Sequence, residues 1–228
     1  MKPWTIVERA RTPGGRELTL SHHDGDYTIS VEGQTLMSSR AHGSEEALAV
    51  LGCQRARKLA APCVLIGGLG MGFTLRAALD VLPPTATVIV SEIVPAIVRW
   101  NQSTLGPLTR HAVVDPRVRL DERGVAAVMQ SNQGRFDAVL LDVDNGPAAL
   151  TQSSNAGLYD DRGVAIARAS LTWGGVLAVW SAGTDPRFVR RLYTGGFTVQ
   201  RERAWSGQKK GSRHTILLAF NGPEPATP

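Results

Sequence analysis

The chain has 228 residues and a net charge of +5, with 43% hydrophobic and 20% charged residues. That length suits one sizeable domain with a small appendage, and the composition is that of a globular protein with a packed core. The cations are dispersed and no block of like charges occurs, so we expect no nucleic-acid partner. Two cysteines make neither a disulfide framework nor a metal-ligand pattern. With no apolar leader and no membrane-length stretch, we expect a cytoplasmic protein without membrane or metal.

Residues 1–42 predict a small β meander. They alternate apolar and polar side chains, and two dipeptides typical of tight hairpin turns, Asp24-Gly25 and Glu32-Gly33, interrupt the alternation. Three or four strands follow from this spacing. A sheet of that size is not stable alone, so we expect it to pack on the rest of the chain or on a second subunit.

A helix is expected next, with Ser44 as its N-cap and Pro62 as its stop. Its first turn is acidic, and its apolar face includes Leu48, Leu51 and Leu59. This helix begins the second expected domain, residues 43–221. The last residues of the chain, 222–228, are expected to be a disordered tail because they are poor in apolar side chains.

Strands and helices alternate through the second domain. The strand-like runs are Cys63–Gly67, Thr87–Glu92, Val118–Asp121, Phe136–Asp142 and Val176–Ser181. The helix-like runs are Phe73–Leu82, Pro95–Leu105, Gly124–Ser131, Asp161–Thr172 and Arg187–Thr194. Two more strands, in "FTVQRERAW" and "SRHTILLAF", follow without a helix between them. The pattern predicts an α/β protein with a doubly wound, Rossmann-like, seven-stranded sheet of the class I methyltransferase type, ending in an antiparallel hairpin.

A glycine cluster at the first strand-to-helix turn is the strongest ligand-binding signal. The sequence "VLIGGLGMGF" lets the backbone approach a ligand closely, and the following helix adds donor N–H groups. The expected binding residues are Gly67, Gly68, Leu69, Gly70 and Gly72. A dinucleotide loop would need a third glycine where Phe73 stands, so the spacing disfavours a nicotinamide cofactor.

Acidic residues end the next two strands. Glu92, followed by Ile93, ends the second strand, where a carboxylate can accept hydrogen bonds from both ribose hydroxyls. The competing interpretation is a surface acid facing Arg99. Asp121 and Glu122 follow the third strand and are candidates for contact with adenine. A helix N-cap is the alternative for Asp121.

Two further acids follow the fourth strand in "FDAVLLDVDNGP". Asp142 and Asp144 are two residues apart, so in extended backbone both side chains point to the same side. Such a pair could bind an amine or remove its proton. The alternative is a simple turn at Asp144. Elsewhere, His42 precedes the first helix and could face the pocket, and Trp180 is expected in the core or the pocket wall.

The order of these pieces resembles the spermidine synthase family of aminopropyltransferases. The resemblance includes the N-terminal meander, "VLIGGLGMG", "VSEI", "RVRLD", "FDAVLLDVDNGP" and "GLYDDRGVAIARASLTWGGVLAVWS". It implies transfer of an aminopropyl group from decarboxylated S-adenosylmethionine to a small amine, and a homodimer formed through the N-terminal strands. It also implies that the glycine loop holds the nucleoside's thioether region, Glu92 the ribose and Asp121 the adenine, while Asp142 deprotonates the attacking amine.

The sequence departs from this family at several positions. The family's loop resembles G-G-G-D-G-G, and here Gly70 stands in place of the acid, with Met71 replacing the next glycine. The missing acid would have held the donor's terminal ammonium and repelled the carboxylate of intact S-adenosylmethionine. A second family acid falls on Asn145, and its Tyr-His-Glu element corresponds only to "HGSEE".

Three functions therefore stay open. The first is aminopropyl transfer, or a related transfer, to an amine. The second is methyl transfer from intact S-adenosylmethionine to an unidentified small acceptor, which the absence of the loop acid favours. The third is a nucleoside-binding protein without catalytic activity. A nicotinamide-dependent dehydrogenase agrees least well with the glycine spacing.

Overall fold

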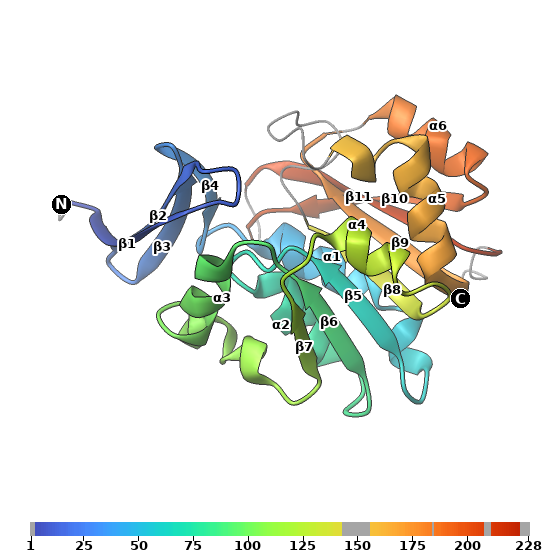
Figure 1. Ribbon diagram of the computed structural model, residues 1–228, viewed down its shortest axis with the longest axis horizontal. Helices are drawn as coiled ribbons and strands as arrows, with labels where there is room; N and C mark the ends of the chain where they lie inside the picture. Colours follow the sequence, from blue (N-terminus) through green and yellow to red (C-terminus); the bar gives the residue numbers. More distant parts are fainter. Residues whose placement is uncertain (1–2, 143–155, 184, 208–210, 224–228) are drawn as a thin grey trace.

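The computed structural model describes residues 3–142, 156–183, 185–207 and 211–223, and their strands form two sheets (Figure 1). The smaller sheet lies at the N-terminal end, to one side of the larger one. It is an antiparallel meander of four strands in the order β1-β2-β3-β4. They are β1 (Thr5–Arg11), β2 (Glu17–His23), β3 (Asp26–Val31) and β4 (Gln34–Ser38).

Both predicted hairpin turns of the meander are confirmed. Asp24-Gly25 joins β2 to β3 and Glu32-Gly33 joins β3 to β4, and all four residues have positive φ, between 46° and 88°. Two successive positive φ angles are what a two-residue hairpin turn requires. Three apolar side chains of this sheet, Leu18, Leu20 and Ile29, are buried in the same cluster as the helices of the larger domain. The meander therefore gains its stability by packing on that domain.

The larger sheet has seven strands in the order β10-β11-β9-β8-β5-β6-β7. All neighbours are parallel except β11, which is antiparallel to both β9 and β10. The predicted fold class is confirmed. The strands are β5 (Cys63–Gly67), β6 (Thr87–Ser91), β7 (Val118–Asp121), β8 (Phe136–Leu141), β9 (Leu171–Ser181), β10 (Thr198–Trp205) and β11 (Arg213–Phe220).

Helices cover both faces of this sheet (Figure 1). One layer comprises α1 (Gly43–Gly52), α2 (Phe73–Val81) and α3 (Pro95–Gln102), and the other comprises α4 (Val125–Gln130), α5 (Asp161–Ser170) and α6 (Pro186–Thr194). Strand β5 is buried on both sides: Val64 and Ile66 pack against the first layer and Leu65 against the second. This explains its continuous apolar sequence. No helix in the described part of the chain is long and apolar enough to cross a membrane.

The first helix differs from its prediction at both ends. Ser44 is not the N-cap, because that position falls on His42 and the Ser44 hydroxyl donates instead to the Glu45 carboxylate. The helix ends at Gly52 rather than continuing to Pro62. Gly52 lies so close to the sheet that a Cβ would overlap the Leu140 side chain. The chain then forms a short 3₁₀ turn, Ala56–Lys58, and leaves Leu59 exposed.

The prediction for the end of α5 was also wrong. The helix stops at Ser170 instead of Thr172, and β9 begins at once with Leu171, five residues before the predicted strand. Leu171 pairs with Phe136 of β8, and an irregularity in the ladder separates this pair from the regular pairing that starts at Val176. Strand pairing at this early position ends the helix. Its N-cap is Asp160, whose carboxylate accepts a hydrogen bond from Gly163 N.

The expected domain limits, 1–42, 43–221 and 222–228, remain predictions. Helix α1 begins at Gly43, directly after the expected N-terminal unit, and β11 ends at Phe220. In the expected tail, the Gly222 carbonyl accepts a hydrogen bond from Thr198, and the Pro223 carbonyl accepts one from Arg55. Residues 224–228 lie outside the described residues.

Candidate functional site

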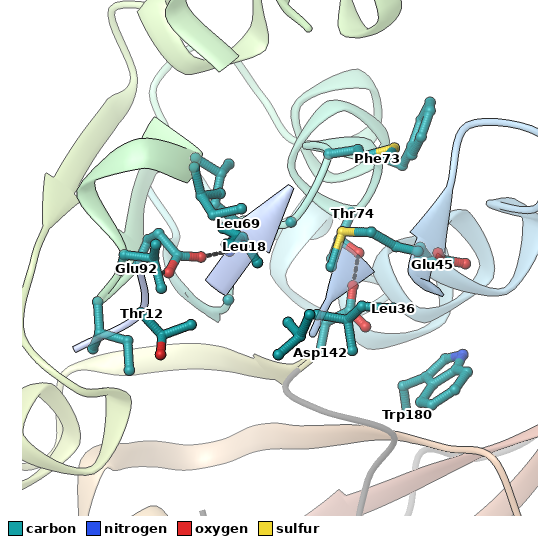
Figure 2. A pocket seen from close by; sticks show the side chains of 18 of the residues that line it. Thr12, Leu18, Leu36, Glu45, Leu69, Phe73, Thr74, Glu92, Asp142 and Trp180 are labelled. Carbon is teal, nitrogen blue, oxygen red and sulfur yellow. Dashed lines mark hydrogen bonds between the residues drawn. The ribbon is translucent and has the colours of Figure 1, made fainter. Parts of the chain in front are cut away.

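A cavity of about 760 Å³ opens at the carboxyl edge of the parallel strands, between the large sheet and the N-terminal meander (Figure 2). Ligands bind at this edge in open α/β sheets. The walls come from the glycine loop, the ends of β6 and β8, the start of α1, the β1–β2 turn, β4 and the β10–β11 hairpin. The charged or titratable side chains in the lining are Arg16, Glu45, Glu92, Asp142 and His214.

The glycine loop after β5 contributes part of the cavity floor. Gly68, Gly70 and Gly72 have φ angles of 89°, 52° and 85°, a backbone region that other residues rarely adopt. Gly68, Leu69 and Gly70 line the cavity. Gly67 and Gly72 are not in the lining: a Cβ at Gly67 would lie 2.8 Å from Val125, and one at Gly72 would lie 2.7 Å from Asn101 Oδ1. Gly67 and Gly72 therefore allow close packing, whereas Gly68 and Gly70 expose their backbone to the cavity.

Glu92 is 8% exposed and lies in the cavity wall at the end of β6 (Figure 2). Its Oε2 accepts a hydrogen bond from Leu69 N at 3.0 Å, and its Oε1 accepts one from Val94 N at 2.8 Å. The carboxylate therefore joins the glycine loop to the segment after β6. A carboxylate held in this way at the carboxyl edge of the sheet is the kind of group that accepts hydrogen bonds from ligand hydroxyls. Ile93, beside it, also lines the cavity.

Asp142 follows β8 and lies in the same cavity. Its Oδ2 accepts a hydrogen bond of 2.6 Å from the Thr74 hydroxyl, in the first turn of α2 (Figure 2). Burial raises the pKa of the Asp142 carboxyl above its ordinary value, and the hydrogen bond from Thr74 opposes that rise. Asp142 thus holds a proton more readily than a carboxyl group in water does. Asp144 lies outside the described residues.

A second carboxyl group in this part of the cavity belongs to Glu45, which the sequence analysis did not select. Burial, and next the negative charge of Asp142, raise the pKa of Glu45 to about 7. The Ser44 hydroxyl donates to Glu45 Oε2 at 2.7 Å and partly opposes this shift. Two carboxyls that interact in a shielded site favour either one shared proton or a bound cation. The three residues "SEE" at 44–46 were the available signal in the sequence, but they are equally typical of a helix start.

Asp121 and Glu122 are not brought into the cavity. Asp121 forms a two-point ion pair with Arg123, which donates from Nε at 2.9 Å and from Nη2 at 2.6 Å, and the Arg123 amide donates as well. The hydrogen bonds from Arg123 lower the pKa of Asp121. Gly124 and Val125 line the cavity nearby. A role in adenine contact remains a prediction for Asp121 and Glu122.

The wall opposite Gly70 is apolar. A Cβ placed on Gly70 would lie 3.3 Å from Sδ of Met37, a residue of β4. Met37 therefore fills the space into which a side chain at Gly70 would extend. Asn101 fixes the Gly70 peptide by donating to its carbonyl oxygen at 2.8 Å. His42 is not in the lining, but it stacks on Phe73, which is, with the ring centroids 4.1 Å apart.

Trp180 and His214 also line the cavity. Trp180 was expected in the core or in the pocket wall, and it lies in the pocket wall. His214 was not among the site residues predicted from the sequence. Their ring centroids are 4.7 Å apart at an interplanar angle of 32°. Burial lowers the pKa of His214, so its neutral form is favoured at neutral pH. Among the described residues, no group of three or more His, Cys, Asp or Glu side chains is arranged to hold a metal ion.

The order of the strands in the large sheet defines a methyltransferase-like fold, and the cavity lies where ligands bind in sheets of this kind. No protein-family model matches the chain, and a search of curated proteins finds no match. Solved structures do match. The spermidine synthase from Thermotoga maritima aligns with a TM-score of 0.75 and 17% identity over 96% of this chain and 74% of its own.

Two further matches have the same description. A spermidine synthase solved in complex with the transition-state analogue AdoDATO aligns with a TM-score of 0.74 and 16% identity, over 96% of this chain and 73% of its own. A probable spermidine synthase from Corynebacterium glutamicum ATCC 13032 aligns with a TM-score of 0.64 and 16% identity, over 96% of this chain and 80% of its own. The resemblance to spermidine synthases is thus confirmed for the fold, and the low identity makes this chain a divergent example of it.

Proposed function

We propose that this protein is a transferase that binds an S-adenosylmethionine-type donor and transfers an aminopropyl group to a small amine. The observation that carries the proposal is the meeting of two kinds of group in one cavity. Glu92 and the glycine loop suit a nucleoside, and Asp142 and Glu45 suit a cation. The shared fold with a spermidine synthase solved with AdoDATO supports the same assignment.

The nucleoside end is assigned from Glu92. Two backbone N–H groups hold the Glu92 carboxylate at the end of β6, the position from which an acid accepts hydrogen bonds from a ribose diol. The positive φ angles of Gly68 and Gly70 let the loop approach a thioether or sulfonium without side-chain interference. The donor is consumed in the reaction and is therefore a substrate.

The acceptor end is assigned from Asp142. An alkylammonium ion is unreactive until it loses a proton, and Asp142 is the base we propose for this step. Its raised pKa brings its proton affinity closer to that of an amine, and Thr74 holds one oxygen in place. Glu45 adds negative charge to the same end of the cavity and favours a cationic acceptor.

The proposed reaction is a direct displacement. The amine nitrogen attacks the aminopropyl carbon that is attached to the donor's sulfonium. The C–N bond forms as the bond between that carbon and sulfur breaks. The electron pair of the broken bond stays on sulfur, which becomes a neutral thioether. The proton of the ammonium goes to Asp142. Catalysis is mainly orientation of the two substrates, with proton removal as the additional contribution.

The test is product formation with defined substrates. The protein is incubated with decarboxylated S-adenosylmethionine and putrescine, and methylthioadenosine is measured by chromatography. We expect methylthioadenosine to appear with the wild type and to be lost with Asp142→Asn, while that variant still binds methylthioadenosine. Absence of the product with the wild type would contradict aminopropyl transfer. Retention of full turnover in Asp142→Asn would contradict the assigned base.

Methyl transfer is the second candidate, and Gly70 is the observation that favours it. The space beside Gly70 is occupied by the thioether of Met37, so no carboxylate there selects an ammonium tail or repels the carboxylate of the intact donor. Calorimetry separates the two functions. Tight binding of decarboxylated donor with none of the intact donor would exclude methyl transfer, and the reverse would exclude aminopropyl transfer.

A further inference from the structure

Trp180 and His214 lie on neighbouring antiparallel strands, and their side chains point towards the helix layer that contains α1. Trp180 of β9 pairs with Ile216 of β11, and His214 precedes Ile216 by two residues, so all three side chains share one face of the sheet. Ile216 is fully buried in the cluster that contains the helices of that layer. Trp180, His214 and Glu45 all line the cavity, and the rings of Trp180 and His214 are in tilted contact. Figure 2 shows Trp180 in the part of the cavity wall that lies towards Glu45 and Asp142.

A close backbone contact joins the start of α1 to the β10–β11 hairpin. Gly43, the first residue of α1, donates a backbone hydrogen bond of 2.9 Å to the Ser206 carbonyl at the end of β10. A Cβ on Gly43 would lie 2.7 Å from the Trp205 carbonyl oxygen, so only glycine allows this approach. The start of α1, which carries Glu45, is thus attached to the hairpin that carries His214.

Among the described residues that line this end of the cavity, the charged side chains are acidic. Glu45 and Asp142 are acidic, and burial keeps His214 in its uncharged form near neutral pH. Two serines of the β10–β11 hairpin, Ser206 and Ser212, also line the wall and add no charge. A cation entering here meets carboxyl groups on one side and an indole ring on the other, which is the pairing that favours an organic ammonium ion.

We propose that Trp180 and His214 form the specificity wall of the acceptor subsite, where the indole contacts an aliphatic primary amine whose ammonium group Asp142 and Glu45 hold. This inference rests on the proposed function, which assigns the amine to Asp142, and it adds the groups that select the amine. Trp180 contributes a cation–π contact and apolar cover. His214 supports the indole and must be uncharged, because a cation at this position would repel the ammonium.

The experiment separates amine binding from nucleoside binding. Protein saturated with methylthioadenosine is titrated with putrescine by calorimetry, and methylthioadenosine affinity is measured alone. We expect Trp180→Leu to weaken putrescine binding about 5- to 30-fold, as loss of a partly desolvated cation–π contact implies, and to change methylthioadenosine affinity less than twofold. Trp180→Phe should retain most of the putrescine affinity. The matched control, Trp173→Leu, replaces an exposed tryptophan outside the cavity lining and should match the wild type.

The His214 variants test the requirement for a neutral ring. We expect His214→Gln to bind putrescine within about threefold of the wild type and His214→Lys to lose detectable binding, with methylthioadenosine affinity retained in both. Wild-type affinity for putrescine in both Trp180→Leu and His214→Lys would overturn the specificity wall while leaving the proposed function intact. Failure of the wild type to bind putrescine in the presence of methylthioadenosine would overturn the amine acceptor and this inference together.

Discussion

Glu45 at the start of α1 and Asp142 at the end of β8 place two carboxyl groups in one shielded cavity. Burial and the charge of Asp142 raise the pKa of Glu45 to about 7, and burial raises the pKa of Asp142. An isolated pair of this kind is costly when both groups are ionised, and a bound ammonium ion would remove that cost. The two carboxyl groups therefore destabilise the free protein when both are ionised, and they would stabilise a bound cation.

The raised pKa of Glu45 predicts a stability effect with a defined sign. In the folded protein Glu45 keeps its proton to about pH 7, whereas its ordinary value is 4.5, so the folded state loses stability as pH rises between these values. Glu45→Gln removes this loss. We expect the variant to be more stable than the wild type at pH 8, by on the order of 3 kcal/mol, and close to it at pH 4.5.

Urea unfolding of the free protein at both pH values measures this difference. Glu122→Gln is the matched control, because Glu122 is exposed and outside the cavity lining, and its change should stay within about 0.5 kcal/mol at either pH. If Glu45→Gln alters the free energy of unfolding equally at both pH values, the coupling of Glu45 to its buried surroundings is not as we describe it.

Glu92→Gln tests the nucleoside end. In glutamine, an NH₂ group takes the place of one of the two Glu92 oxygens that accept hydrogen bonds from Leu69 N and Val94 N. The substitution also removes the negative charge that strengthens hydrogen bonds to ribose. We expect methylthioadenosine affinity to fall about 10- to 100-fold, the range for loss of hydrogen bonds to a charged group. Calorimetry measures the affinity, and the control is Glu17→Gln, which changes an exposed glutamate outside the cavity lining. Equal affinities for wild type and Glu92→Gln would show that the ribose binds elsewhere.

Thr74→Val tests the support of the proposed base. Valine keeps the shape of threonine but cannot donate to Asp142 Oδ2. Because the Thr74 hydrogen bond lowers the pKa of Asp142, its loss should raise that pKa further and move the acidic limb of the pH–rate profile to higher pH. We expect kcat at neutral pH to fall about tenfold. Thr74→Ser retains the hydroxyl and should retain both rate and profile; a Val variant that does the same would exclude this role for Thr74.

Gly70→Asp, combined with Met37→Ala to make room, tests donor selection. Aspartate tolerates the positive φ of 52° at this position better than most residues, and the second change removes the sulfur atom 3.3 Å from the new Cβ. A carboxylate here attracts the ammonium of the decarboxylated donor and repels the carboxylate of the intact one. We expect the affinity ratio of the two donors, measured by calorimetry, to shift about tenfold towards the decarboxylated form.

The matched variant, Gly70→Asn with Met37→Ala, has the same shape without the charge. Any strain at the loop should affect both double variants equally, so only the charge distinguishes them. The same affinity ratio in the aspartate and asparagine variants would mean that the donor's tail does not lie beside Gly70.

The parts of the fold that depend on local pattern were predictable. Turn dipeptides such as Asp24-Gly25 favour a hairpin by their own φ angles, and the short apolar run of β5 is typical of a strand buried on both faces. Because the carboxyl ends of parallel strands meet at one edge, Glu92 and Asp142 could be assigned to one cavity from their positions after two strands.

The site features that the sequence pattern did not predict depend mostly on contacts between residues that are distant in sequence. Glu45 reaches the cavity because Gly43 contacts Ser206 across the fold, and no local signal records that contact. Met37 comes from the separate N-terminal sheet. Asp121 has the strand-end position expected of a ligand-binding acid, but Arg123 two residues later engages its carboxylate.

The most direct test of this account is a crystal structure of the protein with methylthioadenosine. We expect the ribose hydroxyls on the Glu92 carboxylate, the thioether against the loop at Gly68–Gly70, and the space between Asp142, Glu45 and Trp180 left for an amine. A structure in which side chains fill this cavity, or in which the nucleoside binds at another place, would contradict the central claim.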